Sequence, residues 1–401
     1  MMKVKVKGSI RDLLAFKGLV PKRRKRILKS PDTPLVADAV GELSRVLHPR
    51  VQHLVITGVK NETPSAKTFR LEPHRQDGTT RLAPFRAGQY VSIRTEVGGV
   101  RITRPYTISS SPHEKDFYEI TLRRTEGGFL TGHAWEYWRE GTKLDASGPE
   151  GTFFHEPLRD TPEILGLAGG SGVTPFRSMI KDIALGGAQL RLTLLYGIKC
   201  PDDIIFGHEL REFADRFPEK IRVHYVCSEP DSSWEGPTGF LSAACIKDLA
   251  GDLAGKTVFV CGPPQMYRFL REELKAFNLR PKQIRWEAEG EASDIERHPG
   301  FPADAVGKSF RLTVTMGGKT VELPALSGES LLVAMERANL APPSRCRSGE
   351  CGFCRSRIVS GEVFVRPESD GRRAADRMYG HIHPCSSYPV SDVEIAVPRD
   401  P

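Results

Sequence analysis

The chain has 401 residues, more than one ordinary domain holds, and 39% of them are hydrophobic, which suffices for two or three folded cores. Its apolar runs, such as 257–261, are far too short to span a bilayer. The basic N-terminus lacks the apolar core of a secretory signal. These features exclude an integral membrane protein and predict a cytoplasmic one.

The net charge of +8 is concentrated at one end. Residues 1–30 hold eleven Lys or Arg and one acid, so the rest of the chain is slightly negative. A nucleic-acid enzyme would spread basic residues over its folded faces, so we expect no nucleic-acid partner. We take residues 1–50 as a basic arm with a short helix near 36–47. Three interpretations of the arm stay open: peripheral contact with a membrane, binding to an acidic partner, or a solvated tail without a partner. The apolar residues that would accompany the lysines at a membrane are Ile10, Leu13, Leu14, Phe16 and Leu19.

Residues 51–157 form short strands broken by Gly, Pro and polar turns. This rhythm predicts a small antiparallel β-barrel. Over 158–289 the order changes to strand, loop and helix, which predicts an α/β domain with a parallel sheet. The strands expected in these two regions are 53–59, 89–95, 117–124, 143–147, 163–169, 191–197, 221–227 and 257–261.

The C-terminal quarter follows a polar stretch, 290–307, that is rich in Gly and Pro and predicts a linker. Residues 308–401 begin with two strand-like runs, 310–316 and 319–324, and a helix over 328–340. A cysteine-rich loop comes next. The whole chain therefore predicts a multidomain protein.

Four cysteines in this last region have the spacing C-x4-C-x2-C followed by a distant fourth, namely Cys346, Cys351, Cys354 and Cys385. This spacing is typical of plant-type ferredoxins, in which four thiolates hold two irons. Small residues in the loop, Ser348, Gly349 and Gly352, let backbone amides approach a cluster closely. Zinc is the alternative, but zinc sites usually combine two short motifs that each supply two Cys or His ligands, and only one such motif is present here.

With these motifs, the last ninety residues or so resemble the [2Fe–2S] ferredoxin family. The resemblance implies an α+β β-grasp fold with the cluster near the surface. Unlike the acidic plant ferredoxins, this region has thirteen basic and eleven acidic residues. Positive charge near a cluster should raise its potential above roughly −400 mV and suggests an acidic docking face on an electron-acceptor protein, with a solvated rim as the alternative. The basic residues around the cysteines are Arg345, Arg347, Arg355 and Arg357.

The barrel region carries 104-RPYTISS-110, which offers the groups that a flavin needs. Arg104 can neutralise a phosphate, Tyr106 can lie against the ring system, and Thr107 can place a hydroxyl near N5. Strand alternation sets Thr107 on the opposite face from the other two, so a local bend is needed. Downstream, 127-GGFLT-131 is a glycine turn suited to a pyrophosphate at a helix N-terminus.

Two motifs in the α/β region suit a nicotinamide dinucleotide. The loop 170-GSGVTP-175 lies between a buried strand and a helix, with Thr174 expected as N-cap and Pro175 as the first helical residue. Tight strand–helix packing is the alternative reason for its glycines. The segment 261-CGPP-264 follows another buried strand, where Cys261 could equally be a buried thiol.

Together these motifs resemble the ferredoxin–NADP reductase superfamily over residues 51 to about 288. The resemblance implies flavin contacts from Arg104, Pro105, Tyr106 and Thr107, and a pyrophosphate turn, hence FAD, at Gly128 and Thr131. Gly132 replaces a second hydroxyl found in some members, which leaves FMN as an alternative. It also places Thr107 and Cys261 at the hydride-transfer point, as the catalytic residues. The NAD(P)H contacts that it implies are Gly170, Gly172, Thr174, Pro175, Cys261, Gly262 and Pro263.

The choice between NADH and NADPH depends on the segment after the second parallel strand. Lys199 could bind a 2′-phosphate, less selectively than an arginine would. Asp202 and Asp203 could instead accept a ribose hydroxyl, and this favours NADH slightly.

The three modules predict one function. Hydride carries two electrons and a [2Fe–2S] cluster accepts one, while a flavin can take two and release them singly, so positioning and cofactor potentials carry the chemistry. The domain order resembles that of the phthalate dioxygenase reductase family. We expect an NAD(P)H-dependent reductase that supplies an oxygenase, a desaturase or another metalloprotein. The alternatives are a reductase of a small acceptor (quinone, free flavin or ferric chelate) and a redox-sensing binding subunit.

Overall fold

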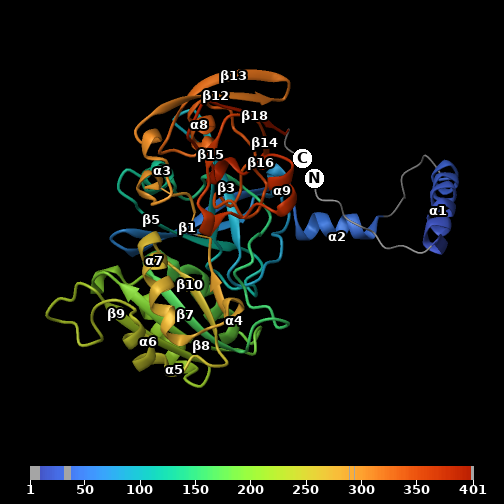
Figure 1. Cartoon of the computed structure of the whole chain (residues 1–401). Coiled ribbons are helices and arrows are strands. Elements are labelled where there is room, and N and C mark those ends of the chain that lie inside the picture. The colour runs from blue at the N-terminus through green and yellow to red at the C-terminus, as the bar shows by residue number, and fades with distance from the viewer. Residues whose placement is uncertain (1–9, 31–37, 289, 293, 399–401) are drawn as a thin grey trace. The chain divides into compact units, whose positions relative to one another are not determined.

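The structure is a computed structural model that describes residues 10–30, 38–288, 290–292 and 294–398. It divides into two compact units, residues 1–46 and 47–401. The first unit holds helix α1 (Ile10–Leu28), with Pro21 inside it, and most of α2 (Ala39–Leu47; Figure 1), which matches the short helix expected near 36–47. Residues 1–9 and 31–37 of the predicted arm, and the side chains of 10–16, lie outside the described part. No helix among the described residues is long and apolar enough to cross a bilayer.

The second unit begins with an antiparallel sheet in the order β4-β3-β6-β1-β2-β5. The sheet curls into a partial barrel, because an isolated bridge between Ile108 and Ile120 joins the end of β4 to β5. Alternate residues such as Leu54, Ile56 and Phe69 fill its interior, as period-2 strands require. Helix α3 (Phe129–Tyr137) closes one end. The strands are β1 (Gln52–Thr63), β2 (Ala66–Pro73), β3 (Tyr90–Val97), β4 (Val100–Thr107), β5 (Tyr118–Arg123) and β6 (Lys143–Ala146).

A five-stranded parallel sheet follows, in the order β11-β10-β7-β8-β9. Its strands are apolar on both faces because helices cover both, with α4 and α5 packed on one side and α6 and α7 on the other. This confirms the predicted α/β fold. The elements are β7 (Glu163–Gly169), α4 (Thr174–Ala184), β8 (Arg191–Ile198), α5 (Gly207–Arg216), β9 (Ile221–Cys227), α6 (Ala243–Ala250), β10 (Thr257–Cys261), α7 (Pro264–Glu273) and β11 (Ile284–Trp286).

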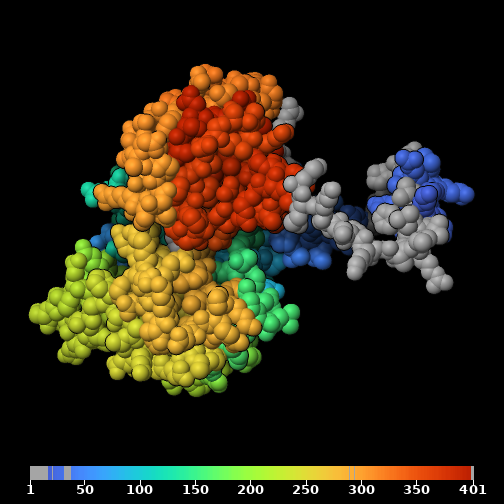
Figure 2. Space-filling view, in the orientation of Figure 1, coloured from blue at the N-terminus to red at the C-terminus, as the bar shows by residue number. Residues whose placement is uncertain are grey.

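The C-terminal region is a mixed sheet in the order β13-β12-β18-β14-β16, with α8 against it, which is the expected α+β arrangement. The stretch expected as a linker packs in part, since Ile295, Phe301 and Ala305 form a small core with Tyr388. Figure 2 shows the broad surface of this orange-to-red region. Its elements are β12 (Ser309–Met316), β13 (Lys319–Leu326), α8 (Leu331–Arg337), β14 (Ser356–Ser360), β15 (Val363–Phe364), α9 (Ala374–Met378), β16 (His381–Ile382), β17 (Tyr388–Pro389) and β18 (Val393–Val397).

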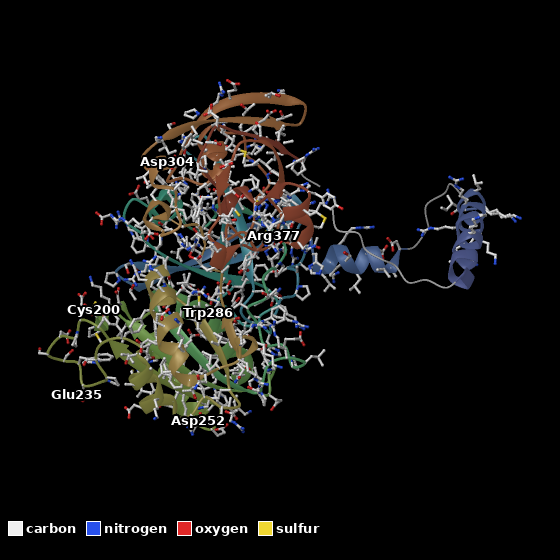
Figure 3. The ribbon with its side chains drawn as sticks, viewed as in Figure 1. Cys200, Glu235, Asp252, Trp286, Asp304 and Arg377 are labelled. Atoms are coloured by element: carbon white, nitrogen blue, oxygen red, sulfur yellow. The ribbon has the colours of Figure 1, made fainter. Side chains whose placement is uncertain are left out.

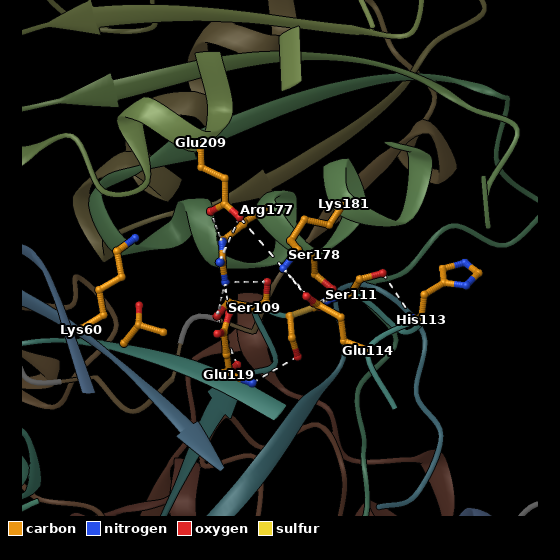
Figure 4. Close-up of polar contacts among 12 residues, drawn as sticks. Lys60, Ser109, Ser111, His113, Glu114, Glu119, Arg177, Ser178, Lys181 and Glu209 are labelled. Carbon is orange, nitrogen blue, oxygen red and sulfur yellow. Dashed lines mark hydrogen bonds and ion pairs between the residues drawn. The ribbon is translucent and has the colours of Figure 1, made fainter. Parts of the chain in front are cut away.

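A buried polar network fixes the parallel-sheet region to the barrel (Figure 4). The guanidinium of Arg177, on α4, lies 2.7 Å from Glu119 of β5 and 2.6 Å from Glu209 of α5. Lys181, one turn further along α4, pairs with Glu114 at 2.7 Å. Because α4 starts at the glycine loop, this network sets where that loop lies relative to the barrel.

Candidate functional site

A cavity of about 630 Å³ lies where three chain segments meet: the end of β4, the loop between β7 and α4, and the loop between β10 and α7. The C-terminal ends of parallel strands are where open α/β sheets bind ligands. Most of the residues expected to contact the flavin and the nicotinamide line this cavity: Pro105, Tyr106, Thr107, Thr131, Gly170, Gly172, Thr174, Cys261, Gly262 and Pro263.

Four of the expected contact residues do not line it. Arg104 turns its guanidinium to Glu336 of α8, at 3.2 Å. Gly128 caps α3 at the N-terminus, and a Cβ there would collide with the Thr131 hydroxyl. Pro175 is buried in the first turn of α4, and Lys199 is exposed and lies 3.6 Å from Glu229.

The glycine loop of the parallel sheet differs from the expected cap. A 3-10 turn, Gly170–Val173, comes first and α4 begins at Thr174, so the N-cap is Val173 and not Thr174. The Thr174 hydroxyl donates to the Ser171 carbonyl at 3.0 Å, which tightens that turn. A Cβ on Gly172 would lie 2.1 Å from the Cys261 carbonyl oxygen. Close packing of the two loops therefore requires this glycine, and the packing brings both nicotinamide motifs to one wall of the cavity.

Of the two carboxylates near Lys199, Asp202 is exposed and Asp203 has other partners. Asp203 lies 2.6 Å from Arg123 of β5 and accepts from the Ser65 hydroxyl at 3.4 Å. It therefore serves the contact between the sheet and the barrel. Lys199 has Glu229 as its neighbour, at the end of the next strand.

Glu287, just after β11, is a cavity residue that the sequence interpretation missed. Burial raises its pKa to about 8, with repulsion from Glu350 adding to the shift. One oxygen accepts from the Ala288 amide at 3.1 Å, and the other has no partner among the described residues. Burial likewise raises the pKa of the Cys261 thiol, so both groups are neutral near pH 7. The available signal was an acid directly after a short strand, 284-IRWE-287.

The four cysteines of the C-terminal loop converge. The sulfurs of Cys354 and Cys385 lie 3.4 Å apart, and that of Cys346 is within hydrogen-bonding reach of Cys351 and Cys385. Two adjoining thiol pairs suit two irons with two thiolates each. Among the described residues, no three His, Cys, Asp or Glu side chains are gathered closely enough to hold a single metal ion.

The backbone around these sulfurs also fits a cluster. The amides of Ser348 and Cys351 point at the Cys346 sulfur, at 3.5 and 3.4 Å, and the amide of Phe353 points at Cys351, at 3.4 Å. Left-handed backbone at Arg347, where φ is 56°, helps turn these N–H groups inward. The buried Ser348 hydroxyl lies within hydrogen-bonding reach of the Cys346 sulfur, so it is directed at the cluster site.

The charge around the loop is smaller than the sequence indicates. Arg345 pairs with Glu150, Arg355 pairs with Asp376, and Arg347 pairs with two acids, Glu291 and Glu336. Three of the four arginines are thus neutralised locally. The expected rise in cluster potential stays a prediction with weaker support.

Cys346 also lines the cavity that holds the flavin motif, next to Tyr90. By contrast, Cys351 is exposed, while the other three cysteines of the loop are buried. One end of the cysteine loop therefore faces the cavity, and another faces solvent.

The sequence matches three protein-family profiles in the same order as these regions. They are an oxidoreductase FAD-binding domain over residues 53–155, an oxidoreductase NAD-binding domain over 167–272 and a 2Fe-2S iron-sulfur cluster binding domain over 314–390. A glycine betaine monooxygenase reductase subunit from Chromohalobacter salexigens is 30% identical over 328 residues, which cover 78% of this chain and 87% of the relative. The chain belongs to the ferredoxin reductase-like flavoproteins with a C-terminal [2Fe–2S] domain.

Other relatives match most of the length of this reductase. The ferredoxin reductase component of 3-ketosteroid-9-alpha-monooxygenase from Mycobacterium tuberculosis is 29% identical over 372 residues, covering 89% of this chain and 98% of the relative. The solved structure of phthalate dioxygenase reductase has the same fold, with a TM-score of 0.62 at 21% identity, covering 87% of this chain and 98% of the other. The protein is thus an NAD(P)H-dependent oxidoreductase with FAD and a [2Fe–2S] cluster, which passes electrons to a partner.

Proposed function

We propose that this reductase supplies single electrons to the oxygenase component of a monooxygenase or dioxygenase. The relatives named above are reductase components of such systems. The observation that carries the proposal is that one cavity is lined by the flavin motif, both nicotinamide motifs and Cys346. Such a site delivers hydride electrons to the cluster, whose exposed side is then available to a protein acceptor.

Within the cavity, we assign roles to this chain's own residues. Tyr106 and Thr107 orient the flavin ring, which supplies the conversion of two electrons into single ones. Thr131 and the N-terminus of α3 hold the pyrophosphate of FAD. Gly172 and the first turn of α4 hold the pyrophosphate of the nicotinamide nucleotide. Neutral Cys261 and Glu287 keep the reacting centre free of extra charge. Cys346, Cys351, Cys354 and Cys385 hold the cluster.

We propose NADH as the electron donor. Glu229 lies beside Lys199, and both side chains are exposed, at 66% and 62%. A 2′-phosphate placed there would meet the carboxylate together with the ammonium, so the site offers it little net attraction. A ribose hydroxyl carries no such penalty.

The acceptor docks on a basic face around the exposed Cys351. The exposed Arg357 and Arg373 carry the charge of this face, because Arg355 and Arg377 are paired with Asp376 and Asp370. The apolar Met378 and Tyr379 of the same region are 71% and 66% exposed. Figure 3 labels Arg377 on this helix. Charge of this sign favours an acceptor with an acidic docking surface. We call this set of residues the basic exit face: Cys351, Arg355, Arg357, Arg373, Arg377, Met378 and Tyr379.

Contact of the arm with an anionic membrane stays a prediction. Residues 22–26 of α1 are consecutive, exposed and mostly basic, and Leu19, Ile27 and Leu28 are exposed beside them. Deleting residues 1–30 should abolish sedimentation with anionic vesicles if the arm binds lipid. Unchanged sedimentation would contradict it.

An anaerobic titration of the purified holoprotein with NADH and with NADPH tests the main proposal. NADH should bleach the flavin and cluster absorbance together at catalytic rates, and NADPH should do so slowly. Turnover of quinone or ferric chelate should be slow compared with internal transfer. A colourless protein after anaerobic reconstitution, or one that contains zinc, would refute the proposal.

A further inference from the structure

A row of four charged side chains joins the barrel to the cysteine loop. Arg104 of β4 lies 3.2 Å from Glu336 of α8, Glu336 lies 2.8 Å from Arg347 in the cysteine loop, and Arg347 lies 2.6 Å from Glu291, after β11. The row thus joins the barrel, the C-terminal region and the segment that follows the parallel sheet. We call Arg104, Glu336, Arg347 and Glu291 the charged row.

The row is buried where it meets the loop. The side chains of Arg347 and Glu336 are 3% and 6% exposed, and that of Arg104 is 26% exposed. Buried charges persist only when they are paired, so removing one member leaves the others in an unfavourable state. Since Arg347 follows Cys346 directly, its ion pairs hold the part of the loop that lines the cavity.

Several N–H donors of the Arg104 guanidinium are not used in hydrogen bonds to the described residues. Its Nη1 donates to the Thr103 carbonyl at 2.9 Å and to both oxygens of Glu336, and in the described part of the chain its Nε and Nη2 have no hydrogen-bond partner. A guanidinium carries five N–H donors in a fixed fork. The next residues along the strand, Pro105 and Tyr106, line the cavity. The Arg104 guanidinium does not itself line the cavity, but these free donors leave it able to hold the phosphate of a flavin bound beside it while Nη1 stays on Glu336.

We infer that the charged row couples flavin binding to docking of the cysteine loop, with Glu336 and Arg347 as positioning residues for electron transfer from flavin to cluster. This inference rests on the flavin place proposed above. Coupling of this kind is reciprocal: flavin on Arg104 tightens the docking of the loop, and a docked loop tightens flavin binding by the same factor.

The variant Glu336→Gln tests the coupling, with Glu329→Gln as matched control. Glu329 is in the same region and pairs only within it, with Arg337 at 2.6 Å. For Glu336→Gln we expect roughly tenfold weaker FAD binding by flavin fluorescence, a coupling typical of linked sites. Transfer from flavin to cluster should slow about tenfold or more, while hydride transfer from NADH to bound FAD is unchanged. The control should match the wild type in all three measurements. Equal FAD affinity and equal transfer rates in the two variants would overturn the inference.

The wild-type chain offers a test that needs no variant. Removing FAD should speed tryptic cleavage after the exposed Arg297, between the parallel sheet and the C-terminal region, relative to cleavage after Arg216 in α5. Equal relative rates with and without FAD would overturn the coupling even if Glu336→Gln did not fold. Failure of the wild type to bind FAD at all would instead refute the proposed function, so the two failures are distinguishable.

Discussion

Glu287 shows how burial sets the charge of one residue. Its carboxyl lies in the cavity with a single hydrogen bond, from the Ala288 amide, and its pKa of about 8 keeps it neutral at pH 7. Among the described residues, its Oε2 has no hydrogen-bond partner, so an ionised carboxylate there would be poorly stabilised. The charge inside the cavity therefore depends on pH through this residue.

We expect the stability of the protein to fall as pH rises through about 8 because of Glu287. Its pKa is near 4.5 in the unfolded chain and about 8 in the folded one, so the stability that it contributes is full below pH 4.5 and is lost as pH rises to about 8. Glu287→Gln should flatten this loss by a few kcal/mol, measured as melting temperature against pH. Glu272→Gln, which removes an exposed carboxylate paired with Lys275, should leave it unchanged. Parallel curves for wild type and Glu287→Gln would contradict the assignment.

Helix α4 connects two functions at the scale of one element. Its N-terminus forms the nicotinamide wall of the cavity, and its next turn carries Arg177, which is 5% exposed and bonded to both Glu119 and Glu209. Burial acts to raise the pKa of Glu119, but attraction to Arg177 outweighs it and holds that pKa below its usual value. Ion pairs of the buried Arg177 side chain thus fix the helix in place.

We expect Arg177→Met to lower the free energy of unfolding by about 3–5 kcal/mol, because it removes the closest cation of the buried Glu119 and of the partly buried Glu209. Urea denaturation followed by circular dichroism gives the change. The control Arg211→Met removes an exposed arginine that stacks on Tyr225, so it should cost less than about 1 kcal/mol. Equal effects of the two substitutions would show that the Arg177 network contributes no more than a surface contact.

At the scale of the whole molecule, the cysteine loop lies between a donor side and an acceptor side. Cys346 lines the cavity and Cys351 is exposed within the basic exit face. We therefore propose that electrons enter and leave the cluster on different sides. Exposed charge on the exit side acts through solvent, so its effect depends on ionic strength.

The double variant Arg373→Glu, Arg377→Glu should raise the KM for an acidic haem protein such as cytochrome b5 about tenfold at low salt, and the difference should shrink at high salt. Reduction of ferricyanide should be unchanged, since it needs no docked protein. The matched control Arg311→Glu, Lys319→Glu places the same charges on β12 and β13, away from α9. An equal effect of both double variants would mean that net charge, and not the exit face, governs the reaction.

The sequence by itself determined the architecture and the cofactors. Periodicity predicted the strands β7, β9 and β10 at their observed bounds, because buried parallel strands are short apolar runs between glycine turns. The cysteine spacing predicted the cluster, because adjacent ligands in one loop are local in sequence. Family motifs predicted FAD and NAD(P)H, and the profiles confirm these cofactors.

Only the tertiary structure decided which charges meet. The pairing of Arg104 with Glu336 spans 232 residues, and that of Arg345 with Glu150 spans 195, so no local pattern could indicate them. The raised pKa of Glu287 depends in the same way on what buries it. The sequence shows which side chains can carry charge. Their ion pairing and pKa depend on the distance to other charges and on burial, and only folding sets both.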